Sequence, residues 1–537
     1  MMTALSRHLL IGLLISGLPI SFSAKAEVVP SGLFGDNAVL QQGRRVPVWG
    51  TASEGERVTV SFGGQKVEAA TKNGKWMAWL EPMKSSFTPQ TMTISGSNTL
   101  TMTNILVGEV WLCGGQSNME RKFPQLVSTD PSQLPPVNLE KEIAAADLPA
   151  IRHILIPQVT SSNPLSTIST TWMICSPKSV TNFTAVGYFF ARDLQKELNV
   201  PIGLINSSWG GSIAAAWSRH EALETNPALN PILTDYNKDV AAYPERLARY
   251  QADEPKIQAR YTKALAEAKA KGQRPPNPPH PPGDPFKNVN SPSYMFNAMI
   301  NPLIPYAIRG VIWYQGETDR LKADQYQKTF PALISDWRNL WGEGDFPFLY
   351  VQIAPCKMVG PEIREAQLLS LKRTKNTAMT VITDWGHPNN MHPIHKEPVG
   401  HRLSLAARAL AYGEKIEYSG PLYKAAQTNG NSITISFDHT GNGLVAKDGP
   451  LKGFLIAGSD KVFIPAQAEI KGESVVVSAP EVTTPVAVRY GWTNVPDVNL
   501  FNQAGLPASP FRTDDWETQT NAPAAAPIRS PQASPGK

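Results

Sequence analysis

The sequence is constrained most by a recurring unit, in which an apolar run of strand character ends in a glycine turn before a helical segment. The first such unit is VGEVWLCGGQSNME at Val107 to Glu120, and a second, PIGLINSSWGGSIAAAW, contains Gly210 and Gly211. Strands that alternate with helices indicate parallel strands joined by crossover helices. In an open α/β sheet, ligands bind beyond the carboxyl ends of the strands. The pattern therefore predicts an α/β fold whose glycine turns face one crevice.

Ser117 lies in the first of these turns, just after Gly114-Gly115 breaks the strand. A serine held there, with the free N–H groups of a following helix facing its hydroxyl, is suited to acyl transfer. The spacing differs from the lipase-type G-x-S-x-G pattern, because Met119 stands where the second glycine would be. Taken alone, the motif fits a plain strand and polar loop better than a nucleophile, so the partners of Ser117 decide its role.

The domain organisation follows from the length of 537 residues, which exceeds what one core supports and predicts two to four domains. Residues 27–105 alternate apolar and polar side chains between turns and predict a β-sandwich. The α/β pattern covers 106–415 and is interrupted at 225–290 by a charged helical segment and a proline-dense loop. Residues 416–516 are again β-rich, and the Ala, Pro and Ser content of 517–537 predicts a disordered tail.

The N-terminus predicts export. Arg7 and His8 precede a short apolar run that ends in Ala24-Lys25-Ala26, the pattern of a cleavable secretory signal over residues 1–26. An uncleaved anchor is the alternative, but the run is short for a membrane span and no later stretch is long enough. We therefore expect a periplasmic or secreted protein. The formal net charge of +5, without a basic block, argues against nucleic-acid binding, and three cysteines do not make a disulfide framework.

A general base for Ser117 is expected among four histidines within fifteen residues: His387, His392, His395 and His401. Their spacing does not match a helical metal-binding pair and prolines prevent a single helix, so no metal site is expected there. A serine mechanism also needs no organic cofactor, and none is expected. His392, on a loop before the final helix, is our choice, because a serine hydroxyl needs a base to take its proton. The group that orients it stays open between Asp384, an asparagine and a backbone carbonyl.

An oxyanion hole needs two or three donors aimed at one point. The candidates all lie at strand-to-loop breaks: the backbone N–H groups of Ser117, Gly210 and Gly211, and the side chain of Gln315. For the two glycines, turn formation alone is the alternative explanation.

Ligand-binding side chains are expected beside the same turns: Gln116, Asn118, Trp209 and Glu317. Trp209 is either a core aromatic or part of a wall on which a sugar ring stacks. Glu317 and Asp319 raise a rival hypothesis, a carboxylate pair for glycoside hydrolysis. That rival leaves Ser117 without a role.

Several segments, in this order, resemble the sialate O-acetylesterase family: GEVWLCGGQSNME, FTAVGYFFARDL, INSSWGGSIAAAW, SYMFNAMINPL, GVIWYQGETD, REAQ and MHPIHKEPVGHRL. The resemblance runs from about Phe34 to Trp516. It implies an SGNH-type serine hydrolase with a flavodoxin-like three-layer α/β/α core and flanking all-β domains.

By that resemblance, Ser117 is the nucleophile, His392 is the base, and Gln315 and a glycine of the Gly210-Gly211 pair complete the oxyanion hole. Arg364, the first residue of REAQ, is expected to contact substrate. The family usually has an acid just before the histidine, whereas this chain has Asn390-Met391-His392. The departure leaves a Ser–His dyad, or a displaced acid such as Asp384, as the alternatives.

These observations predict an exported serine esterase that removes O-acetyl groups from sugars through an acyl-enzyme. The family name indicates sialic acid as the sugar. The alternatives are an acetylesterase acting on xylan or pectin side groups, and a catalytically weak glycan-binding protein.

Overall fold

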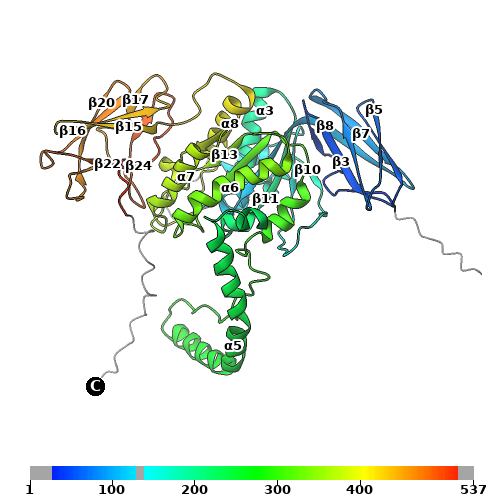
Figure 1. Ribbon diagram of the computed structural model, residues 1–537, viewed down its shortest axis with the longest axis horizontal. Helices are drawn as coiled ribbons and strands as arrows, with labels where there is room; N and C mark the ends of the chain where they lie inside the picture. The colour runs from blue at the N-terminus through cyan, green and yellow to red at the C-terminus, as the bar shows by residue number, and fades with distance from the viewer. Residues whose placement is uncertain (1–26, 128–137, 518–537) are drawn as a thin grey trace, which may run out of the picture.

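The computed structural model of the protein describes residues 27–127 and 138–517. The predicted signal segment, and all but the first residue of the predicted tail, lie outside the described residues. Figure 1 shows a central body of helices and strands with a β-rich region at each end, the N-terminal one in blue and the C-terminal one in orange. Among the described residues, no helix is both long and apolar enough to cross a membrane.

The central sheet has the strand order β10-β9-β11-β8-β12-β13-β14. Its strands are β8 (Thr99–Gly115), β9 (Ile151–Leu155), β10 (Trp172–Ile174), β11 (Ile202–Ser208), β12 (Gly310–Tyr314), β13 (Phe348–Val351) and β14 (Thr377–Thr380). All neighbours pair in parallel except β10 and β9. The residues of β11, β12 and β13 are all buried, as expected for parallel strands covered on both faces. The predicted parallel α/β core is confirmed.

Helices cover both faces of this sheet: α3 (Ala185–Leu198) and α8 (Glu397–Tyr412) on one, α6 (Ala323–Trp341) and α7 (Pro361–Arg373) on the other. Trp111 packs edge-on against Phe190 of α3, and Trp313 packs against Phe330 of α6. The register pairs Trp313 with Gly114, three residues beyond Trp111, so the two indoles point to opposite faces. The short helices α1 (Ser117–Glu120), α2 (Leu139–Ala145) and α4 (His220–Glu224) lie in the connections.

In the described N-terminal β region, seven strands precede β8: β1 (Val29–Pro30), β2 (Val39–Gln41), β3 (Val46–Thr51), β4 (Arg57–Phe62), β5 (Gln65–Ala70), β6 (Lys75–Leu80) and β7 (Ser86–Ser95). The early part of β8 pairs with β7 and β2, and its later part pairs with β11 and β12. One strand therefore belongs to both regions, and the expected boundary at residue 105 falls inside it.

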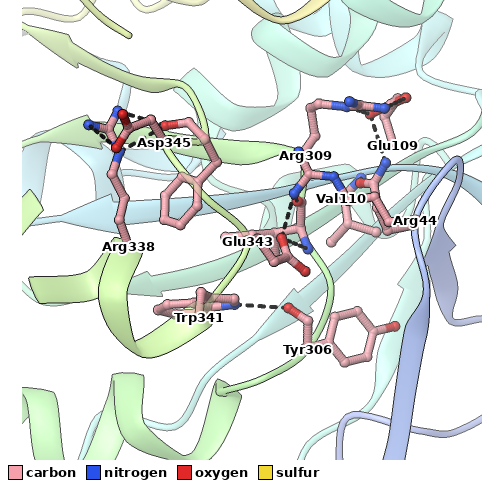
Figure 2. Close-up of polar contacts among 12 residues, drawn as sticks. Arg44, Glu109, Val110, Tyr306, Arg309, Arg338, Trp341, Glu343 and Asp345 are labelled. Carbon is pink, nitrogen blue, oxygen red and sulfur yellow. Dashed lines mark hydrogen bonds and ion pairs between the residues drawn. The ribbon is translucent and has the colours of Figure 1, made fainter. Parts of the chain in front are cut away.

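Buried and partly buried charged side chains join the N-terminal β region to the start of β12 (Figure 2). The carboxylate of Glu109 is fully buried and accepts two hydrogen bonds from Arg309, at 2.6 and 2.9 Å. Gln42 donates to the same carboxylate at 2.6 Å. Arg44 bridges the carbonyl of Ile308 and the carboxylate of Glu343. Because a buried carboxylate is costly unless donors surround it, these contacts specify one arrangement of the two regions.

The expected insertion at 225–290 contains α5 (Asn230–Ala270), which extends away from the body and bends (Figure 1). Pro244 and Pro255 lie inside this helix, where each removes a backbone donor and favours a bend.

The C-terminal region is all β. One four-stranded sheet has the order β15-β16-β21-β20, from β15 (Leu422–Asn429), β16 (Ser432–Asp438), β20 (Gln467–Lys471) and β21 (Ser474–Ser478). A second has the order β19-β18-β22-β24, from β18 (Phe454–Ala457), β19 (Ile464–Pro465), β22 (Ala487–Tyr490) and β24 (Phe511–Arg512). The remaining pair is β17 (Leu444–Ala446) and β23 (Leu500–Asn502).

Candidate active site

Ser117 begins α1 directly beyond the carboxyl end of β8, a central strand of the sheet. The chain turns at Gly115, whose φ is +130° and where a Cβ would lie 2.2 Å from the carbonyl oxygen of Tyr314. Only glycine fits so close to the neighbouring strand in this conformation. The N–H of Gln116 then donates to the same carbonyl at 2.9 Å. The turn that presents Ser117 is therefore held against β12.

His392 lies in the loop before α8, and its Nε2 is 2.9 Å from the Oγ of Ser117. The backbone N–H of His392 donates to Oδ1 of Asn390 at 2.9 Å, which fixes the local turn. The fold thus brings together the two residues that the sequence analysis chose as nucleophile and base. The distance suits transfer of the hydroxyl proton to the imidazole.

The imidazole of His392 is held neutral. Burial, together with the positive charges of Arg121 and Lys396, lowers its pKa from 6.5 to about 4. Within the described residues, the hydrogen bonds of this ring reach Ser117 and no carboxylate. The imidazole is therefore unprotonated at neutral pH, as a general base must be.

Asp384 is engaged elsewhere. Its two carboxylate oxygens accept hydrogen bonds from the Arg402 guanidinium at 2.8 and 2.6 Å. Arg402 belongs to α8, and it also donates to the carbonyl of Val381 at 2.7 Å. The structure does not bring Asp384 to His392, because a bidentate ion pair that holds α8 to the end of β14 occupies it.

Two of the other clustered histidines contact different partners. Nδ1 of His401 is 2.9 Å from Asp193 on α3, and the ring of His395 packs 4.7 Å from that of Trp385. In the part of the chain that the structure describes, no group of three or more His, Cys, Asp or Glu side chains is arranged to hold a metal ion.

Two of the expected oxyanion donors are already occupied. The N–H of Gly210 donates to Oε2 of Glu120 at 2.6 Å. The amide of Gln315, fully buried, donates to the carbonyl of Ser212 at 3.0 Å and to Asp319 at 2.5 Å. The Gln315 amide and the Gly210 N–H are therefore not free in this structure, because neighbouring oxygens accept their hydrogens.

The N–H groups of Ser117 and Gly211 remain, since no hydrogen bond among the described residues uses either. Gly211 has a φ of +77°, and its neighbour Gly210 lies so close to the nucleophile that a Cβ there would be 3.2 Å from the Cβ of Ser117. The second glycine turn thus reaches the nucleophile, as the sequence pattern predicted.

Three expected substrate-binding side chains, Gln116, Asn118 and Glu317, are buried and form hydrogen bonds inside the site. Oε1 of Gln116 accepts from the N–H groups of Gly316 and Thr318, at 3.2 and 3.3 Å. Nδ2 of Asn118 donates to Oε1 of Glu317 at 2.5 Å. These side chains connect the turn after β8 to the turn after β12 and do not line a free surface.

Trp209 and Arg364 differ in position. Trp209 is half-buried, and its backbone N–H donates to the carbonyl of Gly115 at 3.0 Å, beside the nucleophile turn. Arg364, in α7, is fully buried and donates to the carbonyls of Thr493 and Asn494. Arg364 therefore connects α7 to the C-terminal region and is not placed at the Ser117–His392 pair.

Three charged residues beside the pair were not singled out from the sequence: Glu120, Arg121 and Lys396. Glu120 is the last residue of the motif around Ser117, Arg121 follows it directly, and Lys396 lies four residues after His392. Their closeness in sequence to Ser117 and His392 was the available signal. Lys396 is completely buried, an unusual state for lysine that marks it for attention.

Comparisons with known proteins identify the family of this chain. Residues 285–406, from the segment before β12 to α8, match the family model described as carbohydrate esterase, sialic acid-specific acetylesterase. A sialate O-acetylesterase of Rattus norvegicus is 31% identical over 70% of this chain and 72% of its own length. The chain belongs to the sialate O-acetylesterase family. A sialate O-acetylesterase of Mus musculus is 27% identical over 86% of this chain and 90% of its own.

Among solved structures, a carbohydrate acetylesterase from Xanthomonas citri is 34% identical, with a TM-score of 0.74, over 91% of this chain and 100% of that one. Membership in the sialate O-acetylesterase family supports carbohydrate O-acetylesterase activity, as the sequence predicted. The structure argues against the rival hypothesis of a glycosidase that uses Glu317 and Asp319 as its carboxylate pair. Glu317 and Asp319 are both buried in hydrogen bonds to neighbouring amides.

The depressed pKa of His392 predicts activity at acidic pH. The base must be neutral, so activity persists as the pH falls through 6.5, the ordinary value, and is lost only near pH 4, where His392 takes a proton. The pH dependence of kcat/KM for acetate release measures this pKa in the free enzyme. Tryptophan fluorescence over the same range controls for acid unfolding. An acidic limb centred at the ordinary histidine value would contradict this account.

The pairing of Asp384 predicts a stability effect in place of a catalytic one. Asp384→Asn should lower the free energy of unfolding by about 1–3 kcal/mol, because it weakens a charge-assisted contact with Arg402. It should change kcat by less than about threefold, whereas loss of a triad acid costs about 10⁴-fold. Urea unfolding and steady-state kinetics on one preparation measure the two effects. A large loss of kcat with unchanged stability would return Asp384 to the catalytic machinery.

Proposed function

We propose that the protein is an exported serine esterase of the SGNH type that removes O-acetyl groups from sugars with a Ser117–His392 dyad. The observation that carries the mechanism is the 2.9 Å contact between Oγ of Ser117 and Nε2 of His392. Its support from the fold is the position of Ser117 beyond the carboxyl end of a central parallel strand. A flavodoxin-like description of this core is part of the same proposal.

In the first half-reaction, Oγ of Ser117 attacks the acetyl carbonyl carbon while Nε2 of His392 takes the hydroxyl proton. The carbonyl oxygen becomes an oxyanion, and we assign its stabilisation to the N–H groups of Ser117 and Gly211. The tetrahedral intermediate collapses, the C–O bond to the sugar breaks, and the imidazolium gives its proton to the leaving sugar oxygen. The product of this step is acetyl-Ser117.

In the second half-reaction, His392 takes a proton from water, and the hydroxide attacks acetyl-Ser117. Collapse of the second intermediate returns the proton to Oγ and releases acetate. No group outside the chain is required. The low pKa of His392 keeps the imidazole unprotonated and available as a base, at a cost in base strength, and makes its protonated form a strong acid toward the leaving group.

Sialic acid is the proposed sugar, since the matched relatives are named for sialate and the family model for sialic acid. Export to the periplasm or the medium is proposed from the N-terminal pattern at residues 1–26. A panel of O-acetylated sialic acids and neutral acetylated sugars, assayed for released acetate, tests the choice of sugar.

Ser117→Ala tests the mechanism. Removal of the nucleophile should lower kcat for acetate release by about 10⁴-fold or more, because the acyl-enzyme cannot form. Ser335→Ala, at an exposed serine of α6, is the matched control and should retain wild-type kinetics. Acetate release by the Ser117 variant at the wild-type rate would refute the serine mechanism.

A further inference from the structure

The side chain of Asn118, the residue after the nucleophile, makes three hydrogen bonds to different partners. Its Nδ2 donates to the carbonyl of Met391 at 3.0 Å and to Oε1 of Glu317 at 2.5 Å. Its Oδ1 accepts from Nζ of Lys396 at 2.5 Å. Asn118 is fully buried, as is Lys396, so water does not compete for these contacts.

The partners fix which way the amide faces. A lysine ammonium only donates and a backbone carbonyl only accepts, so Oδ1 must face Lys396 and Nδ2 must face Met391. Lys396 also lies over the ring of Tyr314, with Nζ 5.1 Å from its centroid, which favours a positive charge there. The Lys396 ammonium therefore sets the orientation in which Asn118 binds Met391.

These contacts connect the nucleophile to the base through their neighbours in sequence. Asn118 follows Ser117, and Met391 precedes His392. Lys396, at the start of α8, attaches the other end of the loop to the same side chain. The loop that carries His392 is thus joined to the nucleophile turn on both sides of the imidazole. In a triad, a carboxylate orients the histidine ring directly. Here the hydrogen bonds of Asn118 instead hold the backbone on either side of His392.

We propose that Lys396, acting through Asn118, is a positioning residue that holds the His392 loop at Ser117 in the absence of a triad carboxylate. This inference rests on the proposed Ser117–His392 mechanism. Lys396 does not touch the reacting atoms. Its contribution is the geometry of the 2.9 Å contact between Ser117 and His392.

The charges around His392 provide a second readout. Arg121 faces it from α1 and Lys396 from the start of α8, and both lower the pKa of the imidazole. Glu317, from the turn after β12, faces Lys396 through Asn118, and Glu120 is bound to the N–H of Gly210. Below pH 7 the Lys396 amine is charged, because its pKa, lowered by burial, is about 7. Removal of that charge raises the pKa of His392.

Lys396→Met keeps an unbranched side chain, one atom shorter than lysine, and removes the donor and the charge. The expected result is a fall of about 10²-fold in kcat, because the base is no longer held at its productive distance. KM should change by less than about threefold, since substrate does not contact Lys396. The acidic limb of the kcat/KM profile should move to higher pH. Lys328→Met, at an exposed lysine of α6, is the matched control and should match the wild type.

The two proposals fail in different ways. An active Ser117→Ala variant refutes the serine mechanism, and the positioning proposal with it. A Lys396→Met variant with wild-type kcat and an unmoved acidic limb, while Ser117→Ala is inactive, overturns the positioning proposal alone.

A second pair of variants applies if Lys396→Met fails to fold by circular dichroism. Glu317→Leu should lower kcat more than Glu317→Gln, because glutamine keeps an acceptor for the amide of Asn118. Equal kcat values for these two folded variants would overturn the proposal.

Discussion

The hydrogen bond between Ser117 and His392 depends on the parallel sheet more than on any local motif. Ser117 stands where it does because β8 is flanked by β11 and β12, and because Gly115 turns the chain at a φ that other residues avoid. His392 lies 275 residues after Ser117 in the sequence, in the loop that leads into α8. Each element that fixes the sheet, including the buried Glu109–Arg309 pair, therefore supports this one contact.

A hydrolase without a triad acid needs another way to keep its histidine neutral and in place. Burial and two nearby cations favour the neutral imidazole, and the Lys396–Asn118 contacts hold the loop that carries it. In the proposed dyad mechanism, orientation and electrostatics, which a triad carboxylate provides together, are therefore supplied by different groups. Because the cations disfavour the imidazolium formed during attack, the dyad exchanges some stabilisation of that ion for a stronger acid in the leaving-group step.

The sequence predicted the parts of the site that local pattern determines. Ser117, Gly210-Gly211 and His392 all follow from glycine turns, strand ends and family motifs, and the structure brings them together. Asp384, Gln315 and Arg364 have partners that only tertiary packing reveals: Arg402, Asp319 and the backbone at Thr493. The expected division at residue 105 overlooked that one long strand can serve two sheets, since its apolar pattern is continuous across the junction.

The central claim is that acetyl transfer passes through Ser117, and the most direct measurement is mass spectrometry of the enzyme quenched in acid during turnover. Peptide mapping should find an acetyl group on Ser117 in wild-type enzyme mixed with excess acetyl ester. A control sample of enzyme without the ester should carry none at that position. The account predicts that the acetylated fraction rises within the first turnover and falls as substrate is consumed. Turnover without acetyl-Ser117, or with the acetyl group on another residue that forms and decays at the catalytic rate, would contradict it.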